Sequence, residues 1–72
     1  MDAIKLGKLL KESYESAEKG EKVTMIHLFG IKYSEEIQKS NISEIVKESG
    51  IFSTYKTELG KGLKLARYVK LR

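Results

Sequence analysis

The sequence predicts a small all-α domain of four or five helices, and three observations lead to this class. Residues 2–19 place apolar side chains three or four positions apart, as an amphipathic helix does. The most apolar segment, residues 21–33, does not alternate as a strand would. Residues 43–62 have the pattern of two short helices separated by a glycine, which is the arrangement of a helix-turn-helix.

Length and composition narrow the class of protein further. Seventy-two residues make a single domain, residues 1–72, whose core is thin. Because the chain has no cysteine, neither a disulfide framework nor a cysteine-histidine zinc site can support it. Association of two copies remains, so we expect a homodimer. No apolar run reaches membrane length and residues 1–10 lack the apolar core of a signal peptide, which predicts a cytoplasmic protein without membrane contact.

The first predicted helix covers residues 2–19 and contributes to the core. Its inward side chains fall on one stripe, namely Ala3, Leu6, Leu10, Tyr14 (or Ser13) and Ala17. Asp2 suits the first turn of this helix, and Gly20 is expected to end it.

The second predicted helix covers residues 21–33 and is expected to be buried on most sides. Gly30 lies either near its end or at a close contact between helices. The β-branched and aromatic content also allows a strand, but the order of Met25, Ile26, Leu28 and Phe29 favours a helix.

A short third helix is predicted to begin at Ser34 and to run to about Lys39. Ser34 is placed to cap it, with two glutamates in the first turn, where they favour the helix dipole. Residues 40–41 then form a turn, since asparagine tolerates the left-handed conformation.

The helix-turn-helix pattern begins with a helix that Ser43 is placed to cap. Its buried face is predicted to consist of Ile45, Val46 and Ser49. Gly50 suits the left-handed residue that ends such a helix, and Ile51 follows as an apolar contact.

The second helix of the pattern has Ser53 as a cap candidate. Its inner face is predicted to consist of Phe52, Tyr55, Leu59 and Leu63. The opposite side then presents a strip of small hydroxyls, one glycine and lysines, namely Ser53, Thr57, Gly60, Lys61 and Lys64, with Thr54 and Lys56 at its margins.

The last ten residues, 63–72, allow two conformations. Leucine and valine at positions 63, 65, 69 and 71 alternate with other residues, which favours a short C-terminal strand that pairs with another segment or another copy of the chain. A helix with Leu65, Ala66 and Val69 inward is also allowed. Gly60 and Gly62 weaken a single continuous helix, so we favour the extended tail.

The positive charge of the chain is concentrated in its last third. Residues 53–72 carry six lysines and arginines against one acid, Glu58, whereas residues 1–52 carry eight lysines against nine acids. Such an asymmetry is typical of a surface that binds a polyanion, although a solvated basic tail gives the same pattern. Small hydroxyl residues can donate to phosphates or base edges, and lysines add a salt-sensitive attraction.

Residues suited to catalysis or metal binding are sparse. His27 is the only histidine and lies in the most apolar segment, which indicates a buried or boundary imidazole and not a metal ligand. Glu35 and Glu36 point about 100° apart on a helix and cannot act as an acid/base pair. We therefore expect no enzyme activity, no cofactor, no metal site and no small-molecule substrate.

Residues 45–62 resemble the helix-turn-helix of phage-repressor-like transcriptional regulators. The resemblance rests on Gly50-Ile51 at the turn, a hydroxyl residue after it, Leu59 on the inner face and Gly62 closing the second helix. Lys56 stands where that family usually has a β-branched apolar residue. The whole chain also resembles small bacterial proteins with a helix-turn-helix-like domain, through residues 27–33 and 65–69. The second resemblance implies the fold and leaves the activity open.

These features together predict a transcriptional regulator that binds duplex DNA, with residues 53–64 in or over the major groove. The residues expected to contact DNA are Ser53, Thr54, Lys56, Thr57 and Lys61, and those expected to contact phosphates are Lys64, Arg67, Lys70 and Arg72. The alternative is a non-catalytic protein–protein interaction module with the same fold. Its interface would be the apolar segment 23–33 or the tail at residues 65–71.

Overall fold

The computed structural model describes residues 1–71 and contains five helices within them. These are α1 (Ala3–Ser16), α2 (Lys22–Lys32), α3 (Ser34–Gln38), α4 (Ile42–Ser49) and α5 (Tyr55–Leu65). No strand occurs in this part of the chain, so the all-α class is confirmed and the short C-terminal strand is not formed. None of the five helices combines the length and apolar composition needed to cross a membrane.

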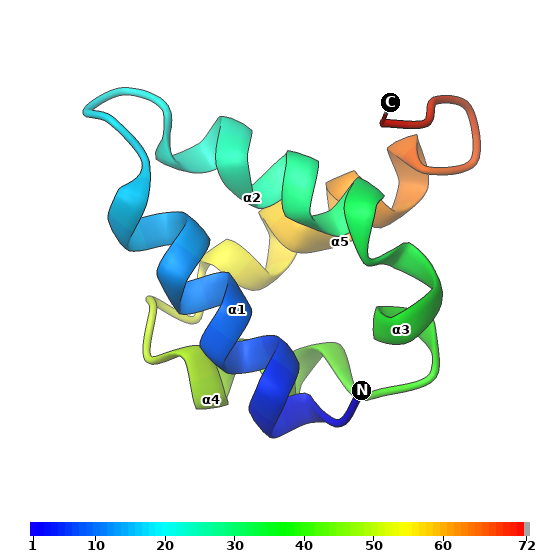
Figure 1. Ribbon diagram of the computed structural model, residues 1–72, viewed down its shortest axis with the longest axis horizontal. Coiled ribbons are helices and arrows are strands. Elements are labelled where there is room, and N and C mark those ends of the chain that lie inside the picture. The colour runs from blue at the N-terminus through cyan, green and yellow to red at the C-terminus, as the bar shows by residue number, and fades with distance from the viewer. Residues whose placement is uncertain (72) are drawn as a thin grey trace.

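The helices are arranged as two crossed pairs. α1 packs mainly on α4 and α2 packs mainly on α5, so that α1 and α2 form one layer in front of the other two helices, with α3 at the side (Figure 1). Each of the five helices contributes to a single core, which consists of Leu6, Leu10, Ile26, Phe29, Ile37, Ile45, Val46 and Leu59. Burial of these side chains is the main source of stability.

α1 begins where the sequence predicts and ends earlier. Asp2 is its N-cap, because the side chain accepts a hydrogen bond of 2.9 Å from the backbone N–H of Lys5. The helix ends at Ser16, and Ala17 is already extended. The Nζ of Lys22 donates to the carbonyl oxygens of Tyr14 and Ala17 at 2.7 and 3.3 Å, which satisfies acceptors at this helix end.

The crossing of α2 and α5 depends on two glycines that face each other. A Cβ on Gly30 would lie 2.9 Å from the Cα of Gly62, and a Cβ on Gly62 would lie 2.5 Å from the carbonyl oxygen of His27. The two backbones therefore approach more closely than side chains would allow. This confirms the close-contact alternative for Gly30. It also corrects the prediction for Gly62, which does not close α5 but lies inside it.

The turn between α4 and α5 forms as the sequence predicts, but the serines predicted to cap the helices on either side of it do not cap them. Gly50 adopts the left-handed conformation with φ of 77°, and Ile51 packs against the core. The cap of α4 is Asn41 and not Ser43, since the Asn41 Oδ1 accepts from the backbone N–H groups of Ser43 and Glu44. Two other predicted caps are also wrong, because neither α3 nor α5 has a side-chain cap hydrogen bond and so Ser34 and Ser53 do not serve as caps.

α5 runs through both of its glycines as far as Leu65. The low helix propensity of the two glycines predicted a break in this helix. Packing against α2 outweighs that propensity. Residues 66–68 form a turn and residues 69–71 have no regular structure, so neither the strand nor a helix through Val69 is present. Leu65, Val69 and Leu71 are each more than 40% exposed.

Candidate nucleic-acid interface

The second helix of the motif, α5, is held by one face and leaves the other open. Tyr55, Leu59 and Leu63 pack into or against the core, as predicted. Helical geometry of 100° per residue places Thr57, Lys61 and Lys64 on the opposite side, and all three side chains are exposed. We call this set, together with Lys56, the lysine strip.

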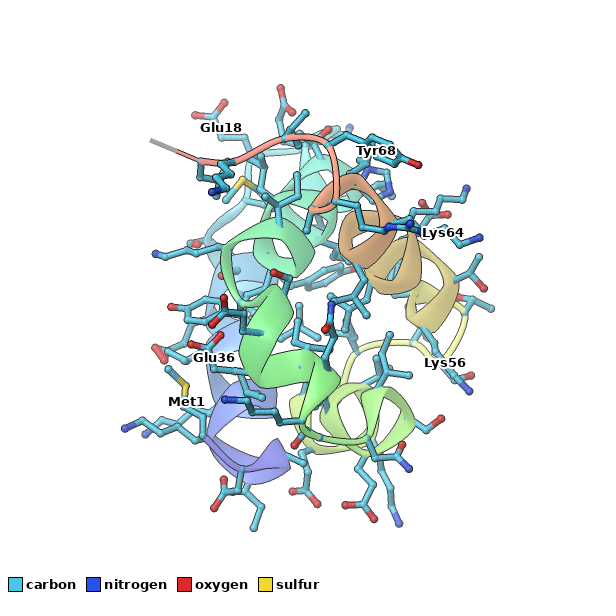
Figure 2. All side chains as sticks on the ribbon, turned by 90° about the vertical axis from the view of Figure 1, so that its right-hand side faces the viewer. Met1, Glu18, Glu36, Lys56, Lys64 and Tyr68 are labelled. Atoms are coloured by element: carbon cyan, nitrogen blue, oxygen red, sulfur yellow. The ribbon has the colours of Figure 1, made fainter. Side chains whose placement is uncertain are left out.

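The lysine strip lies on a single side of the molecule. Figure 2 shows Lys56, Lys64 and Tyr68 along one edge, opposite Met1 and Glu36. Every DNA-contact residue proposed from the sequence within residues 1–71 is exposed, namely Ser53, Thr54, Lys56, Thr57, Lys61, Lys64, Arg67 and Lys70. Arg72 lies outside the described residues. The hydroxyls of Ser53 and Thr54 extend the strip onto the turn that precedes α5.

The cationic tail only partly joins this surface. Arg67 lies beside Tyr68, with its Cζ 5.9 Å from the ring centroid, and Tyr68 lines a hollow together with Lys61 and Lys64. Lys70 instead lines a separate hollow with Glu35, Glu36 and residues of α2. The structure therefore groups Tyr68, with Arg67 beside its ring, next to two lysines of the strip, and places Lys70 next to acidic side chains.

The acid within residues 53–72, Glu58, faces α2 and is paired. Its Oε1 lies 2.7 Å from the Nε2 of His27, and its Oε2 lies 3.4 Å from the Nζ of Lys61. The hydrogen bond from His27 is the main cause that lowers the pKa of the Glu58 carboxyl; partial burial opposes it, and Lys61 adds a smaller lowering. His27 is thus a partly buried boundary imidazole, as its sequence context indicates.

Phe52 occupies a position that the sequence pattern did not predict. It was assigned to the inner face but is 74% exposed, because it precedes α5 and lies on the turn. Its ring is 6.4 Å from that of Tyr55, measured between centroids. An exposed aromatic side chain therefore stands beside Ser53 and Thr54.

Lys47 was missed by the sequence analysis, which considered only the second helix and the tail. It is exposed in the last turn of α4 and lines a notch with Lys56 of α5. Its sequence signal was weak, since α4 also carries Glu44 and Glu48 and has no net positive charge. Among the described residues, no group of three histidines or acids is placed to hold a metal ion.

The comparison with protein families gives one result. A family model described as an HTH-like domain matches residues 2–72, nearly the whole chain. Among curated proteins and among solved structures, none matches the chain at a significant level.

Proposed function

Because the chain belongs to the family of HTH-like domains, we propose that it binds duplex DNA through α5 and acts as a transcriptional regulator. In this proposal the outer face of α5 lies in or over the major groove, as the second helix of a helix-turn-helix does. The lysines of the strip and Arg67 contact phosphates, while Ser53, Thr54 and Thr57 reach phosphates or base edges.

The observation that carries this proposal is the single-sided exposure of Lys56, Thr57, Lys61 and Lys64 on a helix whose other face is fixed by the core. A helix held in this way has its backbone ordered before binding, so the conformational entropy lost when phosphates bind is mainly that of the lysine side chains. Glu58 offsets the positive charge of the strip only at Lys61, whose Nζ lies 3.4 Å from its Oε2, because its other carboxylate oxygen is paired with His27.

Binding as a homodimer is part of the proposal. Helix-turn-helix dimers contact half-sites about 34 Å apart, one turn of the duplex. The molecule measures 28 × 27 × 20 Å along its principal axes, a size compatible with two copies side by side at this spacing. A dimer also doubles the number of phosphate contacts, which raises affinity and its salt dependence.

Fluorescence anisotropy with a labelled mixed-sequence duplex tests the proposal at two ionic strengths. Log affinity is expected to fall with log salt by about 0.9 for each phosphate neutralised. The variant Lys61→Glu/Lys64→Glu should lose binding while its circular dichroism stays unchanged. The control is Lys5→Glu/Lys8→Glu, which changes charge equally on exposed positions of α1. No wild-type binding at low salt, or equal loss in both variants, would contradict a specific α5 interface.

The alternative function, a protein–protein interaction module, is supported by the exposed apolar tail. Leu65, Tyr68, Val69 and Leu71 are 43%, 79%, 45% and 45% exposed. The other interface suggested by the sequence, residues 23–33, is less suitable because Ile26 and Phe29 are buried in the core. A chain that fails to bind DNA but self-associates in a manner abolished by Leu65→Ser/Val69→Ser would support this alternative.

A further inference from the structure

A notch of about 350 Å³ lies between α4 and the beginning of α5. Its lining combines two lysines, two serines and two apolar side chains, namely Ser43, Val46, Lys47, Ile51, Ser53 and Lys56. Val46 is buried and Ile51 is half-buried, so they form the floor, while the four polar side chains are exposed at the rim. The notch thus has an apolar floor and a rim of cations and hydroxyls.

The two lysines at the rim are not neutralised within the described chain. The two ion pairs of residues 1–71 both involve Glu58, and neither contains Lys47 or Lys56. No carboxylate lines the notch. Of the acids on α4, Glu48 faces α1, since its Cβ is 2.6 Å from the position of a Cβ on Gly7, and Glu44 lies one turn before Lys47 without lining the notch.

We propose that this notch binds one backbone phosphate of the duplex, with Lys47 from α4 and Lys56 from α5 on either side of it. The inference rests on the proposed function and extends it, because it makes α4 a part of the interface and assigns a role to Lys47. A phosphodiester matches the chemistry of the site, since it carries one negative charge and accepts hydrogen bonds from ammonium and hydroxyl groups.

The notch is continuous with the lysine strip through Lys56. A phosphate bound there is contacted from two helices, and this fixes the position of the DNA strand relative to α5. Contacts of this kind set the register and orientation of the protein on the duplex and carry no sequence information themselves. Lys47 is accordingly a positioning residue for the face that carries Thr57 and Lys61.

The test compares three neutralising variants, Lys47→Gln, Lys56→Gln and the control Lys5→Gln, in anisotropy titrations over a range of salt. Each of the first two should lower the affinity and reduce the slope of log affinity against log salt by no more than about 0.9, the value of one phosphate, which corresponds to at most a roughly eightfold loss of affinity at 0.1 M salt. Lys5→Gln should change neither quantity appreciably. Lys47→Arg should retain the wild-type slope, because the positive charge is kept.

The double variant Lys47→Gln/Lys56→Gln distinguishes a single phosphate shared by both lysines from two phosphates bound independently. Because one phosphate is worth about 0.9 in the slope, the double variant should reduce the slope by about 0.9 in total, whereas two independent phosphate contacts would reduce it by about 1.8. A reduction of about 1.8 in the slope of the double variant would overturn the shared site, as would a Lys47→Gln variant that behaves like Lys5→Gln. Failure of the wild-type chain to bind any duplex would instead refute the proposed function and, with it, this site.

Discussion

Replacing Gly62 with alanine is expected to destabilise the protein, although alanine is the better helix former. Gly62 lies inside α5 where this helix crosses α2, and an added Cβ would lie 2.5 Å from the carbonyl oxygen of His27 and 3.0 Å from the Cα of Gly30. Carbon and oxygen rarely approach closer than about 3.3 Å. The two helices would therefore have to separate by about 0.8 Å. Backbone atoms on both sides prevent a small local adjustment.

The size of the effect follows from two opposing contributions. Overpacking of this kind costs about 1–3 kcal/mol, whereas alanine in place of glycine inside a helix contributes up to about 1 kcal/mol. Gly60 is the matched control, because it lies in the same helix and nothing is within 4 Å of a Cβ added there. The difference in stability between Gly62→Ala and Gly60→Ala then isolates the cost of the crossing, about 1–3 kcal/mol.

Urea unfolding followed by circular dichroism measures this difference directly. We expect Gly60→Ala to be more stable than the wild type and Gly62→Ala to be less stable. In thermal unfolding, a difference of 1 kcal/mol in stability shifts the Tm of a chain of this size by roughly 4–8 °C, so the Tm values of the two variants should differ by at least about 4 °C. Equal stability of the two variants would refute a close backbone contact between α2 and α5.

Two further predictions concern a cap and an ion pair. Asn41→Ala should lower the free energy of unfolding by about 1 kcal/mol in urea titrations, whereas Ser43→Ala should have little effect, because Asn41 makes the cap hydrogen bonds. Glu58 has a lowered pKa in the folded state, so its contribution to stability is present above the unfolded pKa and is lost as pH falls through the folded pKa. Unfolding measured across this acidic range should therefore show a weaker pH dependence in Glu58→Gln than in the wild type.

Local patterns in the sequence were sufficient for most of the helices and much of the core. Leu6, Leu10, Ile45 and Val46 are buried as their helical spacing predicts, because one face of each amphipathic helix must be removed from water. Gly50 is left-handed as predicted, since this conformation is accessible to glycine without a steric cost. These features depend on residues close together in the chain.

Features that depend on distant residues were not predictable in the same way. Asn41 and Ser43 are both good capping residues, and only the path of the preceding loop decides which one is the cap. The alternation at residues 63–71 resembles a strand, yet Leu63 packs against the core from within α5 because α2 provides a partner for that helix. Phe52 was assigned inward by spacing, but it lies before the first turn of α5.

The candidate site was predictable in its composition but not in its extent. Thr57, Lys61 and Lys64 follow from the helical period of α5 alone, since its inner face is apolar, and Lys56 is expected at the margin of their strip. The separation of Lys70 from this strip required knowledge of how the tail turns after Leu65. Whether any of these residues contacts DNA stays a prediction until binding is measured.

The contact between α2 and α5 links the stability of the fold to the proposed interface. Gly30 and Gly62 allow the backbones of α2 and α5 to come close together. This places the Nε2 of His27 2.7 Å from the Oε1 of Glu58. One carboxylate oxygen of Glu58 is thereby engaged by α2, while the other lies 3.4 Å from the Nζ of Lys61. A change that separates the helices would weaken the His27–Glu58 hydrogen bond and leave Glu58 freer to pair with Lys61. We therefore expect Gly62→Ala to reduce DNA affinity relative to the wild type, under conditions in which both proteins remain folded.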